Sequence, residues 1–404
     1  MKQLVTLLCC AISTILVGQT FTTWTTADGL PSDDLRDVAV APDGTIWIAS
    51  SQGVVAFDGN TFTVHNTTSH PGLASNDVQS IAVTSDGMVW AGTDFGVSVL
   101  DGGSYTTFTT ADGMGDDVVK NVKEAPNGDI WIATINGATR ISEGVFTAFA
   151  SPNIPFGGTL DIAFADNDEV LFSGGLGGVI VYNGNTFSTV GTAQGLLSNR
   201  IRSIAVDDEQ NKWVATAAGI SILDAANVHT GDEAIIFTLP PPDELNPVTD
   251  LGFDPNGRLW AGVYVDYLVT VGGVSVLNDG EWTQFEEADG LAGPNVRRLV
   301  VEGNGDVWVT TSTGLTRISE VSIGIAELAE RRFTLYPNPT ANGLMIQLET
   351  ADPQRTLVEV RDAQGRLCQV ETFMGRTTLD VSQLADGLYM ARIGRSVQPF
   401  VVQH

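Results

Sequence analysis

Residues 72–108 read GLASNDVQSIAVTSDGMVWAGTDFGVSVLDGGSYTTF, and this stretch contains four short apolar segments. They cover 78–83, 88–92, 97–100 and 105–109. Asp86-Gly87, Gly96 and Asp101-Gly102 separate the segments, and such residues tolerate the positive φ of a tight turn. Because no segment has the helical period, the stretch predicts four antiparallel β-strands.

The same pattern recurs along three quarters of the chain. Seven bulky aromatic residues follow one another at intervals of 41 to 48 residues: Trp47, Trp90, Trp131, Phe172, Trp213, Trp260 and Trp308. A glycine lies six residues after six of them (Gly53, Gly96, Gly137, Gly178, Gly219, Gly314), and Leu or Met lies seventeen before five of them (Leu30, Leu73, Met114, Leu196, Leu291). A four-stranded unit with this period predicts an all-β, seven-bladed propeller in which the aromatics pack between blades.

Two copies depart from the pattern. The fourth has Phe172 in place of Trp and one extra residue in 166–169, and the sixth has about seven extra residues before a displaced glycine, Gly273. The seventh copy stops at Ile318, after its third strand. Since Phe21-Thr-Thr-Trp24 matches the fourth-strand pattern of Tyr105-Thr-Thr-Phe108, we expect the N-terminal strand to complete the seventh blade and remove an open edge.

Composition and charge limit what the rest of the chain can form and bind. Residues 1–18 carry one positive charge, an apolar run and a small final residue, which predicts a signal peptide too short to remain as a membrane span. Without it the chain keeps only Cys368, so no intramolecular disulfide forms. The net charge of −28 argues against nucleic acid as a partner. We expect a monomer with a propeller at 19–318, a linker at 319–332, a C-terminal domain at 333–404 and no transmembrane segment after cleavage.

Within the repeats, Gly-Leu-x-x-Asn-x-Val-x-x-Ile followed by Asp-Gly-x-x-Trp-x-x-Thr-x-x-Gly resembles the two-component regulator propeller repeat, over residues 21–318. The resemblance implies a seven-bladed propeller of the kind that forms periplasmic sensors of hybrid histidine kinases and responds to polysaccharide fragments. This sequence has one propeller and no membrane helix or kinase after it. We therefore expect ligand binding without signalling.

The C-terminal segment resembles the sorting domain of the type IX secretion system. The residues that carry the resemblance are Pro337, Asn338, Pro339, Gly387 and Tyr389. Alternating strands broken by Gly turns suit the small β-sandwich that the resemblance implies. It further implies export by the type IX secretion machinery to the outer surface of a Gram-negative bacterium, or into the medium, after a signal peptide has acted. The sequence ends in Phe400-Val-Val-Gln-His404 rather than the family's Lys-rich tail.

An enzyme is the alternative function. The propeller strands are similar to those of streptogramin lyase, which needs a metal and a catalytic His. The chain has four histidines. We expect His65 on a strand, His229 in a long loop and His404 in the sorting domain, so only His70 remains a candidate for a catalytic histidine. None has the spacing of a metal cluster. We expect a protein that is not an enzyme, with a polysaccharide lyase or hydrolase as the alternative and a structural or adhesive surface protein as a third.

Metal binding has little support in the sequence. Asp-Gly and Asn-Gly pairs recur at 43–44, 86–87, 127–128, 256–257 and 304–305, where hairpin turns explain them. A Ca²⁺ loop needs six or more converging oxygens, and these turns fall on separate blades. We therefore expect no metal and no cofactor, and Ca²⁺ remains only as an alternative.

A ligand-binding site is expected on one face of the propeller, where loops that enter each blade and loops between its second and third strands open together. Aromatics beside carboxylates and amides suit recognition of a glycan, and a protein ligand is the other expectation. The candidates from the first loop set are Asp33, Asp34, Asn76, Asp77, Asp116, Asp117, Asn199, Arg200 and Asn295. Those from the second are Asp94, Phe95, Asn136, Tyr264, Asp266 and Tyr267, of which Tyr264 and Tyr267 are the strongest.

Overall fold

The computed structural model describes residues 19–151, 154, 158–166, 168–233, 247–264, 271–278, 280–320, 333–348, 356–363, 366–373, 375–393 and 396–404. The predicted signal peptide and nearly all of the predicted linker lie outside these ranges. The chain forms two compact units, Met1–Val321 and Ser322–His404. In the described part, no helix has the length and apolar character that a membrane crossing requires.

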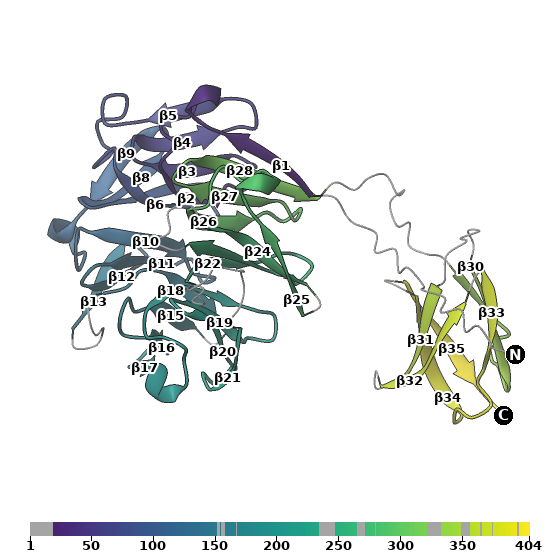
Figure 1. Ribbon diagram of the computed structural model, residues 1–404. Helices are drawn as coiled ribbons and strands as arrows, with labels where there is room; N and C mark the ends of the chain where they lie inside the picture. Colours follow the sequence, from purple (N-terminus) through teal and green to yellow (C-terminus); the bar gives the residue numbers. More distant parts are fainter. Residues whose placement is uncertain are drawn as a thin grey trace, which may run out of the picture. The chain divides into compact units, whose positions relative to one another are not determined.

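Seven four-stranded antiparallel sheets make up the first unit (Figure 1), which gives the predicted number of blades. Blades one to three are β2 (Leu35–Val40), β3 (Ile46–Ser50), β4 (Gly53–Phe57), β5 (Phe62–His65); β6 (Val78–Val83), β7 (Val89–Thr93), β8 (Gly96–Asp101), β9 (Ser104–Phe108); and β10 (Val119–Glu124), β11 (Ile130–Thr134), β12 (Gly137–Ser142), β13 (Val145–Ala150).

Blades four to six are β14 (Ile162–Ala165), β15 (Glu169–Ser173), β16 (Val179–Tyr182), β17 (Phe187–Val190); β18 (Ile201–Val206), β19 (Lys212–Thr216), β20 (Gly219–Leu223), β21 (His229–Glu233); and β22 (Val248–Phe253), β23 (Leu259–Tyr264), β24 (Gly272–Asn278), β25 (Glu281–Phe285). Blade seven contains β26 (Val296–Val301), β27 (Val307–Thr311) and β28 (Gly314–Glu320). Its fourth strand is β1 (Gln19–Trp24), which pairs with β28 along its whole length. The N-terminal segment thus completes the last blade.

The repeated glycines allow close approach of neighbouring strands. Gly53 has a φ of +130°, and a Cβ there would lie 2.3 Å from the carbonyl oxygen of His65. In blade six Gly273 holds the equivalent register, as the sequence predicted: it pairs with Val263, three residues after Trp260, just as Gly53 pairs with Ser50, three residues after Trp47. The positive φ lies one residue earlier there, at Gly272, with a value of +152°.

The core of the propeller lies between blades, as the repeat predicted. Trp131 of blade three packs against Phe172 of blade four, with ring centroids 5.5 Å apart. Met114 and Val119 of blade three join Trp90 of blade two in one buried cluster. Each blade alone would leave these side chains in water, so the blades stabilise one another by burying them.

Short 3₁₀ helices fix four of the loops that enter a blade. They are η1 (Thr26–Asp28), η2 (Thr110–Asp112), η3 (Thr192–Gln194) and η4 (Glu287–Asp289). In η1, the side chain of Thr25 caps the backbone while Asp28 accepts a hydrogen bond from the Thr25 amide at 2.9 Å. These loops are therefore held by their own hydrogen bonds before any ligand arrives.

The second unit is a β-sandwich. One sheet contains β29 (Phe333–Tyr336), β30 (Gly343–Leu348) and β33 (Arg376–Asp380), and the other contains β32 (Leu367–Phe373), β31 (Thr356–Asp362), β34 (Gly387–Ile393) and β35 (Ser396–Val402). Buried residues of both sheets, among them Phe333, Ile346, Val358 and Phe400, form one core.

The motif residues of this unit have structural partners. Tyr389 stacks on Phe400 at 5.7 Å and donates a hydrogen bond to the carbonyl of Ala385. Asn338 accepts one from the amide of Val401 at 2.9 Å, and Pro337 and Pro339 both follow cis peptide bonds. Gly387 begins β34.

Candidate ligand-binding site

A β-bulge lies near the start of the innermost strand in six blades. In β2, for example, the register shifts between Leu35 and Asp37, so that Arg36 occupies the bulge. The other bulge residues are Gln79, Lys120, Arg202, Thr249 and Arg297. A bulge re-aims side chains and increases local twist. Because of the bulge, the bulge residue and the residue that follows it can occupy different sites near the propeller axis.

The residue after each bulge belongs to an inner ring that is buried except for the partly exposed Arg298. Its members are Asp37, Ser80, Asn121, Ser203, Asp250 and Arg298, with Asp161 at the corresponding place in blade four. Several members accept a hydrogen bond from the backbone of the following blade. Asp37 accepts from the amide of Ile81 at 2.9 Å, and Asp250 accepts from that of Leu299 at 2.8 Å. The inner ring therefore links neighbouring blades.

Arg298 is the only cation of the inner ring. Its guanidinium lies 3.2 Å from a carboxylate oxygen of Asp250 and 3.9 Å from one of Asp161. Lys123 approaches Asp161 at 3.0 Å. Burial alone would raise the pKa of Asp161, but Lys123 and Arg298 outweigh it and hold that pKa low. For Asp37, burial dominates over Arg298 and raises the pKa to about 6.

Asp37 should make stability depend on pH. Its folded pKa exceeds its ordinary value of 3.8, so the folded state binds more protons and loses stability as pH rises from about 4 to 6. Asp37→Ser should remove this loss and keep an acceptor, because Ser80 accepts from Val122 in the same ring position. Between pH 4 and pH 7, the unfolding free energy of the native chain should fall relative to that of the variant by on the order of 2 kcal/mol. Denaturant titrations at both pH values check this, and a constant difference would contradict it.

A hollow of about 480 Å³ opens above the inner ring, on the face where the loops that enter the blades begin. Its lining residues are Lys120, Leu160, Arg200, Arg202, Thr249, Tyr264, Asn295, Val296, Arg297 and Arg298, and we call it the upper hollow. Five of these ten residues are Lys or Arg, and none is Asp or Glu. Arg298 also lines a second hollow, of about 490 Å³, on the other side of the inner ring.

Carboxylates border the upper hollow without entering its lining. Arg297 pairs with Asp34 at 2.8 Å, and Lys120 pairs with Asp94 at 3.3 Å. Arg36 is outside the lining and links the border residue Asp34, at 3.6 Å, to Asp77, at 2.7 Å. We call Asp34, Asp77 and Asp94 the acidic rim. Arg200 is exposed, and its side chain has no ion pair with any residue that the structure describes.

The structure brings some of the sequence-predicted site residues together. Arg200, Asn295 and Tyr264 line the upper hollow, and Asp34, Asp77 and Asp94 form its rim. The rest are engaged in loops: Asp33, Asn76, Asp117 and Asn199 accept backbone hydrogen bonds, and Asn136 donates to Asp116. Phe95 is 66% exposed and outside the lining, and Asp266 and Tyr267 lie outside the described residues. Ligand binding by all of these residues stays a prediction.

The cations of the bulge were missed from the sequence. They have a regular signal, since Arg36, Lys120, Arg202 and Arg297 each lie eleven residues before the repeated aromatic. This offset falls at the start of a strand that otherwise alternates apolar and polar residues. The side chains can be placed near the propeller axis only when the bulge at that point is known.

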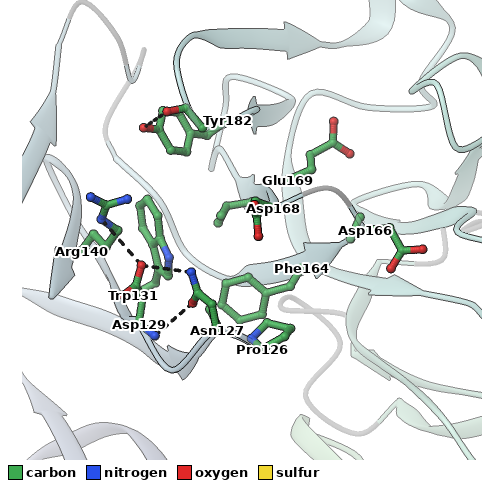
Figure 2. Close-up of a pocket in the computed structure, with 14 residues that line it drawn as sticks. Pro126, Asn127, Asp129, Trp131, Arg140, Phe164, Asp166, Asp168, Glu169 and Tyr182 are labelled. Atoms are coloured by element: carbon green, nitrogen blue, oxygen red, sulfur yellow. Dashed lines mark hydrogen bonds and ion pairs between the residues drawn. The ribbon is translucent and has the colours of Figure 1, made fainter. Parts of the chain in front are cut away.

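A second pocket, of about 360 Å³, lies between blades three and four (Figure 2). Trp131, Phe164 and Tyr182 contribute aromatic surface, and Asp168 and Glu169 are among its carboxylates. In blades five to seven an acidic residue six positions before the Trp (Asp207, Asp254, Glu302) accepts the indole N–H. Ala125 holds that position in blade three, so the Trp131 indole has no acceptor among the described residues. We call this the lower pocket.

The histidines do not gather around a metal-binding arrangement in the described residues, where no group of three His, Cys, Asp or Glu is close enough to hold an ion. His70 stacks on His65 at 4.1 Å, and Tyr105 lies within hydrogen-bonding distance of His65. Burial, together with His70, lowers the pKa of His65 to about 4. His229 is on β21 and not in a loop as expected, because the fourth strand of blade five begins earlier than its composition indicated.

These features define a seven-bladed propeller followed by a sorting domain. Residues 72–95 match the family model of the two component regulator propeller, and residues 334–403 match that of the secretion system C-terminal sorting domain. The sorting domain marks the chain for type IX secretion to the cell surface or the medium. No curated protein matches the sequence.

Solved structures support the fold. PorZ of Porphyromonas gingivalis, described as an essential surface component of the type IX secretion system, is 19% identical with a TM-score of 0.59, and the match covers 93% of this chain and 60% of PorZ. The extracellular domain of BT3049 of B. thetaiotaomicron, described as a hybrid two component system, is 13% identical with a TM-score of 0.62 and coverages of 95% and 60%. Virginiamycin B lyase of Staphylococcus aureus is 13% identical with a TM-score of 0.58 and coverages of 75% and 99%.

Proposed function

We propose that this protein is an exported, non-enzymatic propeller that binds an extracellular glycan or protein at the upper hollow. The observation that carries the proposal is the convergence of Tyr264, Asn295 and Arg200 on one concave site, on the face where the propeller's loops open. A hollow of about 480 Å³ is within the usual size range of ligand sites. The sorting domain supports an extracellular place of action.

The surroundings of the hollow favour binding by a site that is already formed. Four of its five cations lie on the strands β10, β18 and β26, Arg200 directly precedes β18, and Arg298 is fixed from below by Asp250. Side chains held in this way lose little conformational entropy when a ligand arrives. The proposal therefore requires no large rearrangement of the propeller on binding.

A polysaccharide lyase is the second candidate function. Elimination from an acidic sugar needs a base and a cation that neutralises the sugar carboxylate, and Tyr264 shares the upper hollow with arginines. A hydrolase has less support there, since the described lining residues include none of the carboxylates that glycoside hydrolysis uses. Product analysis separates the lyase from the binding protein.

The test is a melting-temperature and product screen of residues 19–404 against polysaccharides and oligosaccharides. A true ligand at a hundred times its Kd should add about 2.7 kcal/mol of stability and raise the melting temperature by several degrees, without new products. The double variant Tyr264→Ala, Asn295→Ala should lose this shift. Val145→Ala, which shortens an exposed apolar side chain outside both hollows, is the control that should keep it.

Three outcomes would contradict the proposal. Unsaturated sugar products would establish the lyase in its place. A melting shift that survives in the double variant would place the ligand elsewhere. Absence of any shift, with glycans and with candidate protein ligands alike, would favour a structural or adhesive role.

A further inference from the structure

We infer that the upper hollow binds the carboxylate or sulfate groups of an acidic oligosaccharide. This inference rests on the proposed function, which it narrows to one class of ligand. It starts from a contrast between the hollow and the remainder of the propeller. Residues 19–320 contain 39 Asp and Glu but only 11 Lys and Arg, and five of those 11 line this single hollow.

The cations of the hollow lie close to one another, although Lys120 pairs with Asp94 and Arg297 with Asp34 at its border. Like charges in one concavity repel one another, and low-dielectric walls strengthen the repulsion. Three of the five, Lys120, Arg202 and Arg297, occupy equivalent bulge positions in blades three, five and seven. Gln79 and Thr249 show that the same position accepts neutral residues. An anionic ligand would offset the repulsion that the three cations create.

The floor of the hollow is also cationic and is held in place. Arg298 lies between the upper hollow and the hollow below it, and its contacts with Asp250 and Asp161 restrain its guanidinium. Arg200 adds an exposed guanidinium that makes no ion pair with the described residues. Guanidinium groups match the geometry of carboxylate and sulfate oxygens, with which they form two parallel hydrogen bonds.

The acidic rim restricts the shape of the ligand. A broad acidic surface, such as that of an acidic protein, would meet Asp34, Asp77 and Asp94 at the border and be repelled. A slender chain can pass the rim and place its anionic groups against the cations inside. Tyr264 and Asn295 offer ring contact and amide hydrogen bonds to sugar rings, which a free inorganic ion would not use.

Matched sugar probes test the inference on residues 19–404. Dextran sulfate and polygalacturonate oligosaccharides are compared with unsulfated dextran and with neutral galactan oligosaccharides, by titration calorimetry at 50 and 300 mM NaCl. We expect the acidic probes alone to bind, and more weakly at the higher salt. Arg200→Gln with Arg202→Gln should weaken binding about tenfold or more, because hydrogen bonds to charged groups are removed. Lys120→Gln should weaken it in the same direction from another blade.

Arg366→Gln with Arg376→Gln in the sandwich changes net charge equally and should leave the affinity unchanged. Equal binding of neutral and acidic probes, lost in the Tyr264→Ala, Asn295→Ala variant, would overturn this inference and leave the proposed function standing. Acidic binding that persists in the arginine and lysine variants would also overturn it, as would displacement of the sugar by equimolar inorganic sulfate. Failure of every glycan and protein probe would contradict both.

Discussion

Deletion of residues 21–26 should lower the melting temperature of the propeller by roughly 10 °C or more. These residues include most of β1, which pairs with β28 on its outer edge. Trp24 stacks on Trp308 at 5.4 Å and meets Phe57 of blade one at 5.1 Å. Phe21 lies 5.5 Å from Phe285 of blade six. The deletion therefore removes an edge strand and opens two inter-blade cores.

Calorimetric or fluorescence melting of residues 19–404 and of the deletion variant measures this effect. The double substitution Thr22→Ala, Thr23→Ala is the control, because both side chains are exposed and the strand itself remains. We expect that control to melt within a few degrees of the native chain. Equal melting of the deletion variant and the native chain would contradict closure by the N-terminal strand.

Arg298→Ala should destabilise the propeller by about 3–5 kcal/mol at pH 7, the usual cost of breaking a buried ion pair from one side. The change leaves Asp37, Asp161 and Asp250 in the inner ring without the guanidinium, while Lys123 remains paired with Asp161. Because Arg298 helps to hold the pKa of Asp161 low, its loss should raise that pKa. The deficit should therefore shrink as pH falls toward 4 and the carboxylates take up protons.

Denaturant titrations at pH 7 and pH 4.5 measure both parts of this expectation. Arg297→Ala is a closely matched control, since it removes the same residue type one position earlier. Its side chain is partly exposed and pairs with Asp34 near the surface, so its loss should cost at most about 1 kcal/mol. Similar deficits for the two variants would show that the inner-ring ion pairs do not carry the stability assigned to them.

The blade architecture could be predicted because its signals are local and repeated. Hairpin glycines, the periodic aromatics and the strand at Phe21–Trp24 each report a feature that a single blade or edge requires. The site was only partly accessible in this way. Tyr264, Arg200 and Asn295 were found because topology assigns their loops to one face.

The other site residues depend on details that the repeat pattern hides. Because of the bulge, Arg298 belongs to the inner ring and lines the hollows on both sides of it, whereas its neighbour Arg297 lines the upper hollow alone. In blade four the inner-ring residue lies eleven positions before the repeated aromatic and not ten as in the other blades, because the extra residue separates Asp161 from Phe172 by one more position. The lower pocket arises where Ala125 replaces an acidic residue of other copies, a change that is visible only once the indole contacts of Trp213 and Trp260 are known.

We propose the upper hollow as the place where this exported propeller binds its ligand. Amide hydrogen exchange of residues 19–404, with and without the tightest-binding saccharide from the screen, locates binding directly. Exchange should slow in the segments 197–202 and 292–298, which contribute Arg200, Arg202, Asn295 and Arg297 to the hollow. Unchanged exchange there, with slowing confined to the lower pocket at 125–131 and 164–170, would contradict the assignment of the site.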